Sequence, residues 1–167
     1  IGDPSSTVSI HEVYDYQCPH CRRQLKQILA LSEDKVRIFL HPTALINRLS
    51  LEEVALVYAV GLSHQDLNEM NSLLLTSNIQ SVQGLKNLIS LLGMSYEQLS
   101  PIMHSKAVKQ EMLEGLHLLK QTQSTQVPLT LISDSISGES VVLEGEQSQS
   151  HLRSIIQSLR QSEIQSV

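Results

Sequence analysis

The chain has 167 residues, of which 41% are hydrophobic, and a formal net charge of −5. This length suits one domain with a sizeable core and room for one insertion, and the acidic balance argues against nucleic acid or an anionic membrane as a partner. A chain with no tryptophan and one phenylalanine is also poorly suited to stacking on bases, and no apolar run approaches the ~20 residues that cross a bilayer. Because the chain begins at Ile1 rather than methionine, we expect a mature or trimmed form that has lost any export signal.

The first elements predict a strand, a helix and a second strand. Residues 8–16 alternate as a β-strand does, with Glu12 on the apolar face. Leucines and isoleucines at helical spacing follow Cys18 until residues 32–34 interrupt them. A second strand is expected over residues 36–40, ended by His41-Pro42. This order and length predict a βαβ unit with a parallel strand pair and a right-handed crossover.

The next stretch, from Ser50 to about Gln123, predicts helices only. Ser50-Leu51-Glu52-Glu53 resembles a capping box and is expected to open a helix that ends near Leu62. Further expected elements are helices over Gln65–Leu75 and Ser81–Leu92, a short turn opening at Ser95, and a long helix that starts at Pro101 and ends at Lys120.

Strand character returns near the end of the chain. Pro128–Ser133 and Val141–Glu144 flank a turn-rich segment, which is typical of a hairpin. An amphipathic helix is expected around Leu152–Leu159, and the tail Gln161–Val167 is expected to fray. The pattern therefore predicts a β-α-β half and a β-β-α half, separated by an all-helical insertion.

The most informative motif is Cys18-Pro19-His20-Cys21, which contains both cysteines of the chain. Residues at positions i and i+3 lie on one face of a helical turn, so the two sulfurs are close enough to form a disulfide. The motif predicts a reversible dithiol/disulfide pair. A zinc site is the alternative, but structural zinc has four ligands and no two histidines lie three to five residues apart.

The residues around Cys18 favour its thiolate. Cys18 is expected at the N-cap of the helix, where backbone N–H groups and the helix dipole stabilise an anion. Pro19 fits the first helical position, and His20 adds a cation or an N–H donor. Cys18 is then the nucleophile, and Cys21 is the more buried, resolving thiol. If the pKa of Cys18 lies ~3 units below ambient pH, the reduced form gains ~4 kcal/mol, or ~90 mV, and the protein gives its disulfide away.

Glu12 is a further candidate site residue. As a partly buried acid beneath the cysteine pair, with a raised pKa, it would exchange protons with Cys21 as the disulfide opens and closes. The alternative is a structural role, in which Glu12 pairs with neighbours on the His11 side or lies at a strand edge.

The string from Thr7 to Cys21 strongly resembles the active-site region of DsbA-like thiol:disulfide oxidoreductases. The resemblance covers nearly the whole chain, including Gly2-Asp3-Pro4, His41-Pro42 and Gln126-Val127-Pro128. It implies an α/β, thioredoxin-like fold with an inserted all-helical domain. The expected boundaries are 1–46 and 121–167 for the thioredoxin-like domain and 47–120 for the insertion.

The resemblance also implies a site and a function. Pro128 would be cis and face the cysteines, Val127 would offer backbone hydrogen bonds to an extended substrate, and Glu12 falls at the family's buried acid position. The implied activity is oxidation of cysteine pairs in newly exported proteins, in the periplasm. Its only redox group would be the Cys18–Cys21 disulfide, with no other cofactor and no metal, and a membrane quinone-linked, DsbB-like partner would restore the disulfide.

Other functions stay open at this point. A disulfide reductase or isomerase would use the same fold, and an isomerase would usually be a dimer, whereas this chain shows no dimerisation domain and is expected to be a monomer. A redox-inactive peptide-binding or chaperone domain could keep the same groove. A kappa-type glutathione transferase relative shares the helical insertion, but such proteins lack the paired thiols.

Overall fold

The computed structural model describes residues 1–63 and 67–165, which form two compact units. The first, here called the sheet unit, comprises Ile1–Tyr14, Pro19–His41 and Leu118–Val167. The second, the helical unit, comprises Asp15–Cys18 and Pro42–His117. The chain therefore passes into the helical unit twice, the first time for the four residues that end at Cys18.

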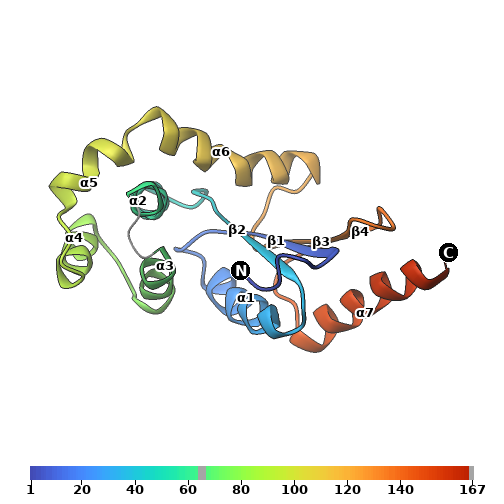
Figure 1. Cartoon of the computed structure of the whole chain (residues 1–167). Helices are drawn as coiled ribbons and strands as arrows, with labels where there is room; N and C mark the ends of the chain where they lie inside the picture. The colour runs from blue at the N-terminus through green and yellow to red at the C-terminus, as the bar shows by residue number, and fades with distance from the viewer. Residues whose placement is uncertain (64–66, 166–167) are drawn as a thin grey trace. The chain divides into compact units, whose positions relative to one another are not determined.

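The sheet unit is built on four strands in the order β2-β1-β3-β4 (Figure 1). Strand β1 (Val8–Tyr14) is antiparallel to β3 (Leu129–Asp134), and Glu12 lies directly opposite Thr130. Strand β4 (Ser140–Glu144) is antiparallel to β3. Strand β2 (Arg37–Pro42) lies beside β1 and is reached through helix α1 (Pro19–Leu29) and the 3₁₀ turn η1 (Ala30–Glu33), the kind of helical connection that parallel neighbours require.

Two helices cover the same side of this sheet in Figure 1, α1 and α7 (Gln149–Gln165). Helix α1 packs against β1, and α7 packs against β3 and β1. Both helices turn an apolar stripe inward, since Leu25 and Ile28 of α1 and Leu152 and Ile156 of α7 are at most 2% exposed. Burial of each such side chain stabilises the fold by roughly 1.5–3 kcal/mol.

The helical unit is arranged around helix α2 (Arg48–Leu62), which contributes Val54, Leu56 and Val60 to its core. Three helices pack against α2, namely α3 (Leu67–Thr76), α4 (Val82–Leu91) and α5 (Tyr96–Met103). Helix α6 (Lys106–Gln121) follows, and its last turn belongs to the sheet unit. Within residues 1–63 and 67–165, no helix combines the length and the apolar character that crossing a bilayer requires.

The sequence predicted two helix starts wrongly. Helix α2 is capped by Asn47, whose side chain accepts a hydrogen bond from the backbone N–H of Ser50 at 3.0 Å, so Ser50 lies inside the first turn rather than at the cap. Pro101 lies within α5 and does not begin a long helix, because that helix has already started after Ser95. The chain turns at His104 and Ser105, and the long helix α6 begins only at Lys106.

Smaller differences occur at element ends. Strand β1 stops at Tyr14 because Asp15 begins a turn, and β2 continues through Pro42 instead of ending before His41. Helix α7 continues past Gln161 to its end at Gln165. Parts of two predicted segments, residues 65–66 and 166–167, lie outside the described residues.

Candidate functional site

The two cysteines lie at the start of α1. Cys18 directly precedes the helix, which begins at Pro19, and Cys21 is its third residue. Proline fits this first position because its missing N–H would have no partner within the helix. Both cysteines are thiols in the structure, with 7% of Cys18 and 0% of Cys21 exposed. Cys18 is therefore the sulfur that another molecule reaches more easily, which is the order expected from the sequence.

The charges of α1 favour an anion at Cys18. The helix has eleven residues and no acidic side chain in its first turn, so no carboxylate of that turn neutralises the positive end of the helix dipole. Lys26, in the last turn, balances the negative end. A thiolate at Cys18 therefore faces the helix end where negative charge is stabilised.

The segment before the motif is fixed by Asp15, whose side chain is fully buried. One carboxylate oxygen, Oδ2, accepts the backbone N–H groups of Leu45 and Ile46 at 2.8 and 3.0 Å. The other, Oδ1, accepts the backbone N–H of Gln17 at 2.8 Å and the hydroxyl of Ser50 at 2.9 Å. Asp15 thus joins the residues leading to Cys18 to the loop before α2 and to its first turn.

Tyr16 and Gln17 add two more links within the helical unit. The Tyr16 hydroxyl donates to Oδ1 of Asn71 on α3 at 2.5 Å. The Gln17 side-chain amide donates to both carboxylate oxygens of Glu53 on α2, at 3.0 and 2.9 Å. These contacts, together with those of Asp15, explain why residues 15–18 group with the helices although they follow a strand.

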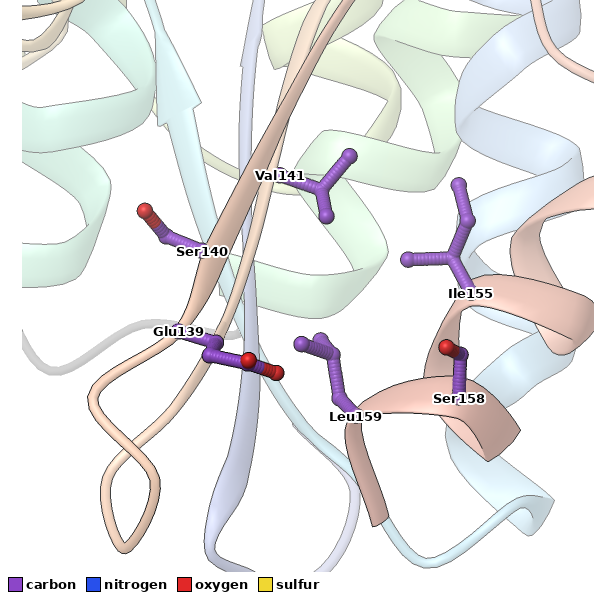
Figure 2. Close-up of a pocket in the computed structure, with 6 residues that line it drawn as sticks. All are labelled: Glu139, Ser140, Val141, Ile155, Ser158 and Leu159. Carbon is purple, nitrogen blue, oxygen red and sulfur yellow. The ribbon is translucent and has the colours of Figure 1, made fainter. Parts of the chain in front are cut away.

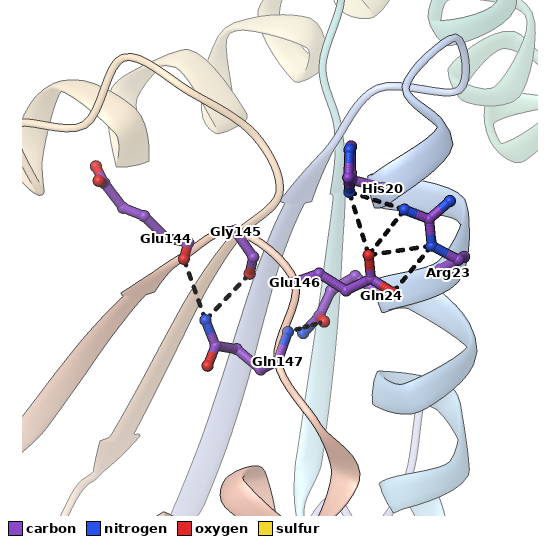
Figure 3. A network of polar contacts seen from close by, with 7 residues as sticks. All are labelled: His20, Arg23, Gln24, Glu144, Gly145, Glu146 and Gln147. Carbon is purple, nitrogen blue, oxygen red and sulfur yellow. Dashed lines mark hydrogen bonds and ion pairs between the residues drawn. The ribbon is translucent and has the colours of Figure 1, made fainter.

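His20 is mostly exposed and belongs to a surface network (Figure 3). Its Nδ1 lies 3.2 Å from a carboxylate oxygen of Glu146, in the loop between β4 and α7, and Nε of Arg23 donates to both oxygens of that carboxylate at 3.0 Å. The hydrogen bonds from Arg23 and His20 lower the pKa of Glu146. This exposed ion pair contributes little to stability, but it holds the imidazole in place beside the start of α1.

Glu12 lies in the interior of the sheet unit, fully buried on β1. Burial raises the pKa of Glu12 to about 8, and a hydrogen bond from Thr130 acts in the opposite direction. The Thr130 hydroxyl reaches Oε2 at 2.6 Å, whereas Oε1 makes no hydrogen bond to the described residues. Glu12 is therefore an interior acid that changes charge near neutral pH.

The Val127–Pro128 peptide bond is cis. Pro128 is buried and Val127 is half-buried, packed against a small apolar cluster that contains Val13 and Leu129. The Pro128 carbonyl accepts the backbone N–H of Gly145 at 2.9 Å, which continues the pairing of β3 with β4.

Two polar connections therefore join the elements that carry the predicted site residues. In the loop after β4, the backbone N–H of Gly145 donates to the Pro128 carbonyl. In the same loop, the Glu146 carboxylate accepts a hydrogen bond from Arg23 of α1 (Figure 3). Glu12 is joined to α1 through Thr130, whose hydroxyl lies 3.2 Å from the side-chain nitrogen of Gln24. Both connections lie within the sheet unit.

The sequence did not single out Asp15, Gln24, Thr130 or Glu146. A signal existed for Gln24, which follows Cys21 by three residues and so lies on the same face of α1. Asp15, three residues before Cys18, could have been identified as a turn-forming side chain. Nothing in the sequence pairs Glu146 with His20, because the two residues are 126 positions apart.

A hollow of about 460 Å³ lies elsewhere in the sheet unit, between β4 and α7 (Figure 2). Glu139, Ser140 and Val141 line one side, and Ile155, Ser158 and Leu159 line the other. None of the residues predicted for the site lies in it. The described residues also contain no group of three or more histidine, cysteine, aspartate or glutamate side chains placed to hold a metal ion.

Comparison with known proteins gives one family and several similar structures. A family model described as thioredoxin matches residues 1–158. No curated protein sequence matches the chain. A thioredoxin-like oxidoreductase from Silicibacter pomeroyi is 20% identical, with a TM-score of 0.85 over 96% of this chain and 91% of its own.

Two further structures are similar at lower identity. The thiol-disulfide exchange protein alpha-DsbA2 from Wolbachia pipientis is 18% identical, with a TM-score of 0.77 over 95% of this chain and 84% of its own. The catalytic domain of Proteus mirabilis ScsC is 17% identical, with a TM-score of 0.75 over 95% and 86%. At these identities the likeness is one of fold, and it confirms the thioredoxin-like α/β class expected from the sequence.

Proposed function

Because this chain belongs to the thioredoxin family, whose model matches residues 1–158, we propose that it is a thiol:disulfide oxidoreductase with a reactive Cys18–Cys21 disulfide. The observation that carries the proposal is the placement of both cysteines at the positive end of α1, where both are buried and Cys18 is the more exposed of the two. The similar structure named as a thiol-disulfide exchange protein, alpha-DsbA2 from Wolbachia pipientis, supports the same activity.

The chemistry is two successive thiol–disulfide exchanges. A substrate thiolate attacks Sγ of Cys18, a bond forms between the two sulfurs, and the Cys18–Cys21 bond breaks with Cys21 leaving as a thiolate. A second substrate thiolate then attacks the substrate sulfur of this mixed disulfide and releases Cys18 as a thiolate. The substrate gains a disulfide, and its two electrons stay on the two cysteines of this chain.

The direction proposed is oxidation of the substrate. The N-terminus of α1, whose first turn has no acidic side chain, and the imidazole of His20 stabilise the Cys18 thiolate, which is the leaving group of the second exchange. Pro19 supports this arrangement because it starts the helix without removing an intrahelical hydrogen bond. A more stable thiolate makes the reduced protein more stable and its disulfide more oxidising.

Glu12 is proposed to move the proton that Cys21 needs. Protonated Glu12 gives its proton to the Cys21 thiolate as the disulfide opens, and Glu12 takes a proton back when the disulfide is restored. A pKa of about 8 suits this role because both charge states are then accessible near neutral pH.

The surrounding biology is proposed by resemblance to DsbA-like proteins. The substrates would be newly exported proteins in the periplasm, held as extended segments against the backbone of Val127 beside Pro128. A membrane quinone-linked, DsbB-like protein would restore the disulfide. The chain would act as a monomer, with no cofactor beyond its own disulfide.

Trapping a covalent intermediate tests the activity. In a Cys21→Ala variant the resolving thiol is absent, so a test peptide whose one cysteine is held in a mixed disulfide with a good leaving thiol should form a lasting adduct, as the Cys18 thiolate attacks the peptide sulfur and the leaving thiol departs. The Cys18→Ala variant, which keeps the buried Cys21, is the matched control and should form none. Peptide binding without an adduct in the Cys21→Ala variant would instead support a redox-inactive binding domain.

The equilibrium with glutathione tests the direction. An oxidase requires a reduction potential well above the cytosolic glutathione poise, near the ≈ −120 mV of a strong oxidant. A potential near that poise would favour a reductase or isomerase and would contradict the proposed direction.

A further inference from the structure

A chain of three hydrogen bonds runs through the interior of the sheet unit to Glu12. The backbone N–H of Gln147 donates to the side-chain oxygen Oε1 of Gln24 at 2.7 Å. The side-chain nitrogen Nε2 of Gln24 donates to the hydroxyl of Thr130 at 3.2 Å, and that hydroxyl donates to Oε2 of Glu12 at 2.6 Å. All three side chains are fully buried, and Figure 3 shows the first link at the loop after β4.

The donor and acceptor roles in this series of hydrogen bonds are fixed at its outer end, at Gln147. A backbone N–H can only donate, so Gln24 must present its oxygen to Gln147 and its NH₂ group to Thr130. The Thr130 hydroxyl accepts from that NH₂ group, and its single hydrogen therefore goes to Glu12. A backbone amide 123 positions along the sequence from Gln24 thus fixes the Thr130 hydroxyl as a donor to Glu12.

We propose that Gln24 and Thr130 are positioning residues that hold Oε2 of Glu12 as a permanent acceptor and leave Oε1 as the oxygen that takes up and releases the proton. A proton on Oε2 would force the Thr130 hydroxyl to accept two hydrogen bonds, and its own hydrogen would lose its partner in the interior. A proton on Oε1 displaces nothing, because Oε1 makes no hydrogen bond to the described residues. The inference rests on the proposed function, in which Glu12 exchanges a proton with Cys21.

The pKa of Glu12 is raised by burial and lowered by the hydrogen bond from Thr130. Strand β3 and helix α1 present Thr130 and Gln24, and Cys21 is the titratable group on the same face of α1. On the other face of β1, His11 contacts His41 of β2. The cations of α7, Arg153 and Arg160, bond to the segment at residues 34–35. The hydrogen bond from Thr130 thus favours the ionised form of Glu12, whereas burial favours the protonated form.

The test uses a Cys18→Ser/Cys21→Ser background, in which no thiol chemistry occurs. Infrared difference spectroscopy follows the C=O stretch of protonated Glu12, assigned by its loss in Glu12→Gln. Thr130→Val removes the hydroxyl at nearly constant volume, and Thr130→Ser, which keeps it, is the matched control. If the proton resides on Oε1, the C=O group is Oε2, so Thr130→Val should move the stretch to higher frequency and Thr130→Ser should leave it nearly unchanged.

The titration of the same band gives a second readout. Loss of the donor to Oε2 should raise the titration midpoint of Glu12 by about one pH unit, a tenfold change in proton affinity. Gln24→Met should change both readouts in the same direction but by less, and it carries the test if Thr130→Val does not fold. A stretch and a midpoint that are equal in the valine and serine variants would overturn the proposal.

The spectroscopic test of Glu12 and the trapping test of the proposed function can fail independently of each other. The spectroscopic result needs no redox-active cysteine, so it stands or falls on the geometry around Glu12 alone. Failure of the Cys21→Ala variant to trap a peptide would reject the oxidoreductase activity and leave the position of the proton unaffected.

Discussion

Replacement of Glu12 by glutamine should change how the stability of this protein depends on pH. Glu12 is fully buried, and burial raises its pKa from an ordinary value of 4.5 to about 8. Glutamine keeps the size of the side chain and an oxygen that can accept the Thr130 hydroxyl, but it never carries a charge. The difference between the two proteins therefore isolates the ionisation of one carboxyl group.

The expected magnitude follows from the raised pKa. Below about pH 4.5 the carboxyl is protonated in both the folded and the unfolded chain, so its ionisation does not distinguish the wild type from Glu12→Gln. Between pH 4.5 and about 8 the folded chain binds the proton more tightly than the unfolded chain, so the stability of the wild type falls as pH rises. At ~1.4 kcal/mol per pH unit, the wild type should lose about 5 kcal/mol relative to the variant across this range.

Urea unfolding of the reduced proteins, followed by circular dichroism from pH 4.5 to 8.5, measures this difference. Both proteins share every other titrating group, including His41, so subtraction of the two curves removes their contributions. A difference that stays within about 1 kcal/mol over the whole range would refute the reasoning, because Glu12 would then ionise at its ordinary pKa and could not act as an interior acid.

Three further outcomes are expected. Asp15→Ala should lower the free energy of unfolding by about 3 kcal/mol, because it removes the buried carboxylate that accepts the backbone N–H groups of Leu45 and Ile46; a loss below 1 kcal/mol in urea would contradict this. Glu146→Gln should leave the urea midpoint nearly unchanged in the same assay, since its ion pair is exposed, and a clearly lower midpoint would contradict this. Burial and the neighbouring His11 lower the pKa of His41 to about 4, so its ring protons should titrate near pH 4 by NMR, and a midpoint near 6.5 would contradict that environment.

The fold could be predicted from sequence where one local pattern dominated. The hairpin around residues 134–138 could be predicted because two alternating segments flank a turn-rich stretch. Gly138 in this stretch adopts a positive φ of 72°. Helix α4 could also be predicted, because Ser81 caps its start and Gly93 follows its end. In both places the local residues favour one structure, and no nearby residue favours another.

The fold was misjudged where two local signals competed. Asn47 and Ser50 are both good capping residues, and the choice between them depends on the extended backbone of Asn47, which the sequence does not reveal. Pro101 is well suited to begin a helix, but it can also lie within a short one that earlier residues have started. Competing cap signals a few residues apart therefore limit the prediction of helix ends.

The candidate site likewise contains some residues that the sequence could predict and others that it could not. Cys18 and Cys21 could be identified because their chemistry depends on a spacing of three residues. The residues that surround Glu12 could not, since Thr130 lies 118 positions from Glu12 and 106 from Gln24. These contacts depend on strand register and on the face that α1 turns inward, and both are consequences of the whole fold rather than of a motif.

The central claim is that the start of α1 stabilises a thiolate at Cys18. The most direct measurement is the rate of iodoacetamide alkylation of the Cys21→Ala variant as a function of pH, because Cys18 is then the only thiol in the chain. We expect a midpoint below about pH 7, in the range of cysteines at helix N-termini. A midpoint near the ~8.5 of an ordinary cysteine would contradict the account.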